Sequence, residues 1–272
     1  MRDKIRSLLA DLKLRGIATQ LDGVLNEAEK NGTAISDVLL ELLEAEHRDQ
    51  QERSLASRVK RAKIPWPWTI DTFPFNQQPT INKAQIMGLA KLNFIERNEN
   101  IILIGEAGTG KSGIATALLR LAVFNGYRGR FYNAQDMLND IYASFADRTT
   151  SKVLKNLSTY DLLIIDELGF LSLNPEQVNM FFKLIDMRYQ KKSTIITTNL
   201  KFEDWYEVFN KKQLVDAMLD RFRHYCTTIY IEGPSLRVPQ SSTEAPSKQK
   251  SMKKGAAKDQ GVTEALVNTV RE

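Results

Sequence analysis

Residues 105–112 have the sequence Gly-Glu-Ala-Gly-Thr-Gly-Lys-Ser, and this stretch decides the fold of the chain. It fits the pattern GxxxxGK(S/T) without a mismatch. An apolar strand is expected before it, over residues 100–105, and a helix with Ile114, Leu118 and Leu119 apolar is expected after it. Glycines in such a loop let backbone N–H groups point at phosphate oxygens, and the positive end of the following helix faces the same anion. The pattern therefore predicts a loop that binds the phosphates of a nucleotide.

The charged and hydroxyl residues of this loop predict its two cofactors, ATP and Mg²⁺. Lys111 supplies a fixed cation for the β- and γ-phosphates, and the Ser112 hydroxyl is a ligand for the metal ion. The remaining residues expected to contact the nucleotide are Gly105, Gly108, Thr109 and Gly110.

A second signature lies at residues 161–167, where four aliphatic residues stand between Asp161 and the pair Asp166-Glu167. Such a run predicts a central parallel strand that is buried on both faces. Carboxylates at its C-terminal end fall where parallel sheets bind ligands. We expect Asp166 to hold Mg²⁺ and Glu167 to polarise the attacking water; the alternative is an acidic loop of the kind that can follow any buried strand.

Two further polar residues are candidates for the same site. Asn199 follows a third buried strand, residues 193–198, where it could orient the lytic water or simply cap the next turn. Arg221 could reach a γ-phosphate as an arginine finger. A surface salt bridge from Arg221 to Asp216 or Asp220 is an equally good interpretation of the bare sequence.

The chain divides into four expected regions. From residue 99, apolar strand patterns alternate with amphipathic helix patterns, which predicts an α/β fold with a parallel sheet flanked by helices. The regions are an N-terminal helical domain over 1–64, an ordered linker over 65–98, an ATPase domain over 99–238 and a disordered, lysine-rich tail over 239–272. The aromatic residues of the linker are expected to pack onto a neighbouring domain, and they are Trp66, Trp68, Phe73 and Phe75.

Composition limits the class of protein. The 272 residues are 42% hydrophobic and 26% charged, as in an ordinary soluble globular protein. No apolar stretch reaches the roughly 18 residues of a membrane span, and the N-terminus lacks a secretory pattern, so we expect a cytoplasmic protein without a membrane partner. Cys226 is the single cysteine, and we expect a buried structural thiol.

Basic residues gather at the end of the expected N-terminal domain. Residues 53–63 hold five basic side chains and no acidic one, and Arg58, Lys60 and Arg61 lie within this segment. They could form an arm that contacts phosphates, or the solvated face of a helix. The net charge of +5 does not decide between these, because residues 235–272 alone carry seven basic and four acidic side chains.

The order of these motifs resembles that of the AAA+ ATPases. Over roughly residues 1–238 the chain resembles more closely the IstB-type transposition helper ATPases, which are related to DnaC-type helicase loaders. The stretches that carry this resemblance are RAKIPWPWTIDTFPF (61–75), YDLLIIDELGFLSL (160–173) and MLDRFRHYCTTIYIEGPSLR (218–237).

The resemblance implies a role for each candidate residue. Lys111 and Ser112 would belong to the Walker A motif, and Asp166 and Glu167 to the Walker B motif. Asn199 would be sensor 1, and Arg221 would be an arginine finger acting on a neighbouring subunit. Residues 135–158 would form a helical insertion that holds DNA, with Arg148, Lys152 and Lys155 as its basic side chains.

Some residues depart from the family pattern. Glu106 and Ala107 stand where relatives usually carry proline, and Gly113 replaces a common histidine. Neither change removes a phosphate ligand, although Glu106 places an anion near the anion site. A sensor 2 arginine is not assigned, because no helical lid domain is expected after residue 234. Arg237 is the sole local candidate, and a weak one.

The expected function is that of an ATP-driven helper in transposition, which assembles as a ring or spiral on duplex DNA and stimulates a partner transposase. A helicase loader with the same core is the alternative, and a DNA-coating scaffold without ATP turnover is a third possibility. Tyr142 and Phe145 are expected to face the core, and the basic residues 148, 152 and 155 are expected to share one helix face. This pattern favours contact with a duplex backbone over stacking on bases.

Overall fold

The computed structural model describes residues 2–169 and 173–237, except for the side chains of Arg223 and His224. The chain forms two compact units, with the boundary between Arg58 and Val59. The expected disordered tail, 239–272, lies outside the described residues. No helix in the described ranges is long and apolar enough to cross a membrane.

The N-terminal unit consists of helices. They are α1 (Arg2–Asp11), α2 (Arg15–Asn31) and most of α3 (Ile35–Ala62). Their apolar core contains Leu9, Ile17, Leu21, Val24 and Leu42. The buried carboxylate of Glu46 accepts hydrogen bonds from the backbone nitrogens of Gly16 (2.8 Å) and Ile17 (3.3 Å). Glu46 therefore satisfies free N–H groups at the start of α2, where the positive helix end favours a negative charge.

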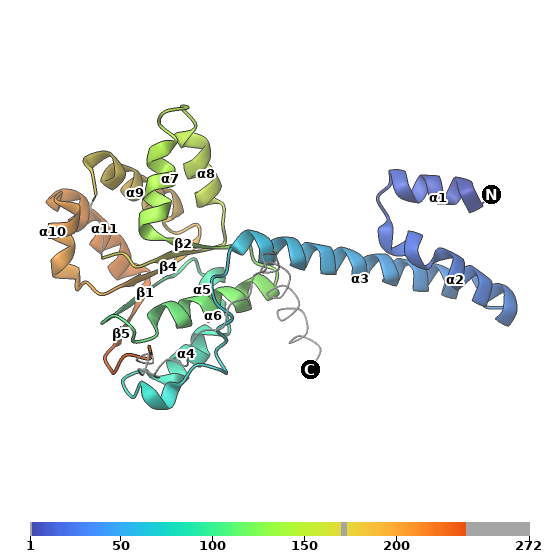
Figure 1. Cartoon of the computed structure of the whole chain (residues 1–272), viewed down its shortest axis with the longest axis horizontal. Coiled ribbons are helices and arrows are strands. Elements are labelled where there is room, and N and C mark those ends of the chain that lie inside the picture. The colour runs from blue at the N-terminus through green and yellow to red at the C-terminus, as the bar shows by residue number, and fades with distance from the viewer. Residues whose placement is uncertain (1, 170–172, 238–272) are drawn as a thin grey trace, which may run out of the picture. The chain divides into compact units, whose positions relative to one another are not determined.

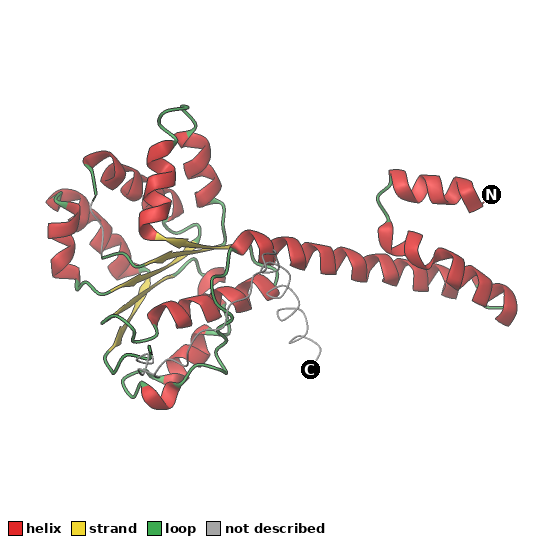
Figure 2. Ribbon diagram, viewed as in Figure 1, coloured by secondary structure: helices red, strands yellow, loops and turns green. Residues whose placement is uncertain are grey.

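The second unit contains a five-stranded parallel sheet in the order β2-β3-β4-β1-β5 (Figures 1 and 2). The strands are β1 (Asn100–Gly105), β2 (Gly129–Asn133), β3 (Leu162–Asp166), β4 (Ser193–Thr198) and β5 (Cys226–Ile231). The larger helices are α6 (Lys111–Phe124), α7 (Ala134–Ala143), α8 (Thr150–Ser158), α9 (Pro175–Arg188) and α11 (Lys212–His224), and the shorter ones are η1 (Phe75–Gln77), α4 (Lys83–Leu89), α5 (Asn93–Glu96), η2 (Phe202–Asp204) and α10 (Trp205–Phe209). The predicted α/β fold is confirmed.

Alternate residues of the central strands face two different cores. Ile102 and Ile104 of β1 pack with α7 to α11 on one face of the sheet. Ile101 and Leu103 of the same strand pack with α6 on the other face. The two layers are visible on either side of the sheet in Figure 1. Burial on both faces explains why the strands are continuous apolar runs instead of alternating patterns.

Residues 65–98 pack on the α6 side of the sheet. Phe73 is buried there, and Trp68 and Phe75 pack against the same core. Trp66 is different, since it is 44% exposed and its ring meets Phe131 edge-on with the centroids 5.9 Å apart. The amide nitrogen of Gln78 donates to the carbonyl oxygen of Pro234 (2.6 Å), which ties this segment to the chain that follows β5.

The insertion between β2 and β3 corrects two expectations. Ile141 is buried, as expected, but Tyr142 and Phe145 are 48% and 41% exposed and contact each other at the surface. Tyr142 lies about 100° round the helix from Ile141, and Phe145 follows the end of α7. Arg148 precedes α8 in left-handed backbone (φ 58°), so only Lys152 and Lys155 share a helix face.

Cys226 opens β5 and is half-buried, which is less burial than expected. Burial still raises the pKa of its thiol to about 12. The thiol therefore stays protonated at neutral pH, and a structural role remains the interpretation that fits it.

A buried arginine joins α8, α9 and β4. Arg188 is 1% exposed, and its guanidinium donates to the carbonyl oxygens of Leu157 and Tyr160 (both 2.9 Å), to that of Ser193 and to the hydroxyl of Thr194 (2.9 Å). Burial lowers its pKa to about 9, which leaves it charged at neutral pH. Because Leu157 belongs to the last turn of α8, Arg188 satisfies free carbonyl groups at that helix end.

Candidate nucleotide-binding site

The glycine loop connects β1 to α6 and is folded around the side chain of Lys111. Gly108 (φ 83°) and Gly110 (φ 96°) adopt left-handed backbone, which a residue with a Cβ rarely tolerates. The Lys111 ammonium donates hydrogen bonds to the carbonyl oxygens of Gly105 (2.7 Å) and Glu106 (2.8 Å). The Thr109 hydroxyl also donates to the carbonyl oxygen of Glu106 (2.8 Å). The glycines thus permit the turns that bring the loop round the charged side chain.

Lys111 and Asp166 are both buried and stabilise each other's charge. Asp166 is 2% exposed, and burial raises its pKa, while the Thr197 and Ser112 hydroxyls and the Lys111 ammonium act in the opposite direction. Burial lowers the pKa of Lys111, while Asp166, Glu106 and Glu167 oppose that shift. Ser112 and Asp166 together offer a hydroxyl and a carboxylate oxygen, which are the ligands that Mg²⁺ prefers. The donor set fits the predicted metal ion.

Glu167 is held in one orientation from two sides. Its backbone is left-handed (φ 61°), which is uncommon for a residue other than glycine. Its backbone nitrogen donates to the Thr197 hydroxyl (3.0 Å), and its carboxylate accepts from the Asn133 amide (2.9 Å). Asn133 is the last residue of β2 and stands opposite Asp166 in the sheet. Sequence reasoning missed Asn133, although it is polar and ends a strand of the same sheet.

The end of β4 also meets Asp166 and Glu167. The Thr197 hydroxyl donates to Asp166 Oδ1 (2.5 Å), a contact that sequence reasoning missed. Asn199 lies one residue beyond β4 and lines the same pocket as Lys111 and Glu167. Gly169 lies so close to Asn199 that a Cβ at that position would come within 2.2 Å of the amide oxygen. A run of threonines that closes a buried strand was the available signal for Thr197.

Lys111, Ser112, Glu167 and Asn199 line a pocket of about 310 Å³. The glycine loop and the ends of β3 and β4 form one side, and Trp66, Trp68, Leu236 and Arg237 also line it. The backbone nitrogen of Leu236 donates to the carbonyl oxygen of Gly108 (2.8 Å), so the chain after β5 is tied to the loop. Arg237 is near enough to lower the pKa of Lys111. It therefore remains the local candidate for a sensor arginine.

The remaining candidates lie outside this pocket. Arg221 forms an ion pair with Asp186 of α9 (2.9 Å) and lies over the ring of Tyr189. A surface salt bridge thus forms, but with a different partner from the two that the sequence suggested. The candidate DNA-binding residues also lie elsewhere: Arg148, Lys152, Lys155, Lys60 and Arg61 are exposed, and Arg58 is partly buried.

The sheet order and the position of the loop define the class of protein. The chain is a P-loop protein of the AAA+ type, with the phosphate loop after β1 and the acidic pair after β3. Its fold is similar to that of the DnaC helicase loader, with a TM-score of 0.52 and 23% identity over 62% of this chain and 99% of that one. It is also similar to the replication initiator DnaA bound to AMPPCP and single-stranded DNA, with a TM-score of 0.54 and 21% identity over 62% of this chain and 51% of that one.

Comparison of sequences identifies the family. Residues 7–244 match the family of IstB-like ATP binding proteins, and the chain belongs to this family. It is 37% identical to a protein of insertion sequence IS232 from Bacillus thuringiensis subsp. berliner, over 84% of this chain and 91% of that one. It is 35% identical to a protein of insertion sequence IS21 from Pseudomonas aeruginosa, over 86% and 89% of the two chains. Both relatives are described as ATP-binding proteins. This chain is therefore an ATP-binding protein of the insertion-sequence type.

Replacing Lys111 by alanine is expected to weaken ATP binding at least about tenfold, because a charge-assisted hydrogen bond contributes about 1.5–3 kcal/mol. Binding of a fluorescent ATP analogue measures the effect, and circular dichroism checks the fold. Lys91→Ala is the matched control, since Lys91 is exposed and does not line the pocket. Equal affinity in both variants would contradict the assignment of Lys111 to the phosphates.

Proposed function

We propose that this protein hydrolyses ATP at contacts between subunits, assembles in this way on duplex DNA and stimulates a separate transposase. The observation that carries the proposal is the convergence of Lys111, Ser112, Glu167 and Asn199 on one pocket, with the buried Asp166 beside it. The relatives from insertion sequences support a role in transposition.

Each residue of the pocket has a distinct part in the proposed hydrolysis. Lys111 holds the β- and γ-phosphates, and Ser112 and Asp166 hold Mg²⁺, which neutralises phosphate charge when it is bound. Glu167 takes the proton of the attacking water, and Asn199 orients that water. Gly105, Gly108, Thr109 and Gly110 shape the loop around the phosphates. Asn133 acts as a positioning residue, because its amide fixes the direction of the Glu167 carboxylate.

Glu167→Gln is expected to retain ATP binding and to lower the rate of hydrolysis at least about 100-fold, because a general base contributes 10²–10⁴ in rate. Phosphate release measures the rate, and a fluorescent ATP analogue measures binding. Glu176→Gln, an exposed carboxylate on α9, is the matched control. Hydrolysis at the wild-type rate in Glu167→Gln would favour a scaffold in which the nucleotide is a structural ligand.

Arg221 is proposed to complete the site of a neighbouring subunit. It does not line the pocket of its own chain, and it lies partly exposed on α11 in an ion pair with Asp186. An exposed pair of this kind contributes at most about 1 kcal/mol, so the arginine can exchange its partner for a phosphate. Such a head-to-tail contact closes into a ring or continues as a spiral.

Arg221→Ala is expected to lose hydrolysis by about 10³-fold or more while each subunit still binds ATP. Mixing this variant with Lys111→Ala should restore part of the activity, because some mixed interfaces combine an intact Lys111 with an intact Arg221. Phosphate release at varied mixing ratios measures the recovery. If the mixture assembles without any recovery, Arg221 does not act across a subunit contact.

Two surfaces of the chain support contact with DNA. Arg148, Lys152 and Lys155 are exposed on the insertion, and α8 carries no acidic residue. Arg58, Lys60 and Arg61 lie near the end of α3, where they form the second proposed contact.

The exposed pair Tyr142 and Phe145 favours the alternative function, because a helicase loader acts on single strands and bases stack on aromatic rings.

Duplex DNA is expected to bind at least as tightly as single-stranded DNA of equal length, in the presence of a non-hydrolysable ATP analogue and with little dependence on sequence. Fluorescence anisotropy measures both affinities, and omission of the nucleotide is the control. A preference for single strands that disappears in Tyr142→Ala/Phe145→Ala would support the helicase loader instead. Addition of the transposase encoded by the same insertion sequence then tests stimulation directly.

A further inference from the structure

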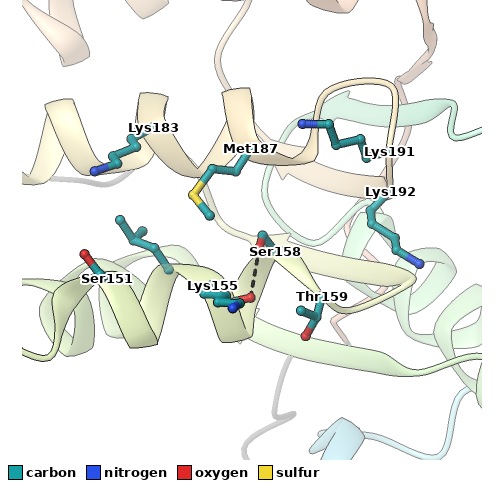
Figure 3. A pocket seen from close by; sticks show the side chains of 9 residues that line it. Ser151, Lys155, Ser158, Thr159, Lys183, Met187, Lys191 and Lys192 are labelled. Carbon is teal, nitrogen blue, oxygen red and sulfur yellow. Dashed lines mark hydrogen bonds between the residues drawn. The ribbon is translucent and has the colours of Figure 1, made fainter.

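A groove of about 740 Å³ lies between α8 and α9, away from the nucleotide pocket. Figure 3 shows Lys183 and Met187 of α9 facing Lys155 and Ser158 of α8, with Lys191 and Lys192 at one end. The last two residues directly precede β4, so this end of the groove lies at the N-terminal edge of the sheet. The glycine loop follows the C-terminal end of β1, at the opposite edge.

The lining of the groove is basic. Four lysines line it, Lys155, Lys183, Lys191 and Lys192, and no acidic residue is among the lining side chains. Lys192 is paired with Asp161 (2.5 Å). In the described part of the chain, Lys155, Lys183 and Lys191 form no ion pair. Three ammonium groups from three different segments thus share one groove without a counter-charge, which favours a bound anion.

Hydrogen bonds from the buried Arg188 hold the two walls of the groove, α8 and α9, together. This buried side chain bonds the carbonyl oxygens of Leu157 and Tyr160 at the end of α8 and that of Ser193 at the start of β4. It therefore connects the two helices and the turn that carry the lysines. Preorganised walls lower the entropy cost of binding, because the protein does not have to order them when the anion arrives.

We propose that this groove holds the phosphodiester backbone of duplex DNA, with Lys155, Lys183 and Lys191 on the phosphates. The inference rests on the proposed function and extends its DNA contact beyond Lys152 and Arg148 to α9 and the following turn. The ammonium groups of the groove can donate hydrogen bonds to phosphate oxygens. No aromatic ring is among the lining residues, so the groove offers no platform for unpaired bases.

The test compares two double variants of the full chain that lose the same charge. Lys183→Gln/Lys191→Gln changes the groove, and Lys91→Gln/Lys212→Gln changes exposed lysines that do not line it. Affinity for a duplex of fixed length is measured between 50 and 200 mM salt with a non-hydrolysable ATP analogue. The groove variant should reduce the magnitude of the slope of log K against log salt by about 1.8 per bound subunit, because each of the two lost phosphate contacts contributes about 0.9. The ratio of the wild-type affinity to the variant's affinity should therefore fall by about 12-fold between 50 and 200 mM salt.

Further measurements separate the possible outcomes. Lys183→Arg/Lys191→Arg should restore the slope, and ATP turnover without DNA should be unchanged in all variants, because the groove lies apart from the nucleotide pocket. An unchanged slope in the groove variant, with tight binding by the wild type, would overturn the groove assignment and leave the proposed function standing. An equal reduction of the salt slope in the control variant would show an effect of net charge alone, and it would also overturn the groove assignment. Absence of duplex binding by the wild type would sink the proposed function and this inference together.

Discussion

The burial of two opposite charges at one edge of the sheet, the Lys111 ammonium and the Asp166 carboxylate, is the constraint that governs the site. Burial disfavours the charge of each residue, and each favours the charged form of the other. Lys111 follows β1 and Asp166 ends β3, and β4 lies between these strands in the sheet. The two charges lie at the same edge of the sheet because the strands are parallel. Thr197 of β4, the strand that lies between β1 and β3, donates a hydrogen bond from its hydroxyl to the Asp166 carboxylate.

Helix α9 connects the surfaces to which we assign different parts of the function. Lys183 faces the basic groove, Asp186 pairs with Arg221, and Arg188 is buried between α8 and β4. The helix begins with a capping box, in which Asn174 and Gln177 bond to each other's backbone nitrogen. Both ends of α9 are therefore held by hydrogen bonds, which fix the helix that carries the exposed charges Lys183 and Asp186.

The local motifs were readable from the sequence because they depend on residues that are close along the chain. The strand, the glycine loop and the helix that begins at Lys111 occupy 25 consecutive residues, from Asn100 to Phe124. The apolar runs before Asp166 and Asn199 likewise predicted strands that the structure contains. The environment of aromatic residues was harder to predict, because Tyr142 lies at the margin of the apolar face of α7, Phe145 follows the end of that helix, and both are exposed.

The class of fold and the residues of the phosphate loop follow from the sequence alone, because glycine, lysine and serine in that spacing have few other uses. The residues that stand beside them depend on how distant segments pack. Asn133 reaches Glu167 across 34 positions of sequence, and Thr197 reaches Asp166 across 31. The order of the strands brings these residues together, and so does the packing that places Lys155, Lys183 and Lys191 around one groove. Contacts of this kind follow from the pairing of distant segments, and no local pattern of residues encodes them.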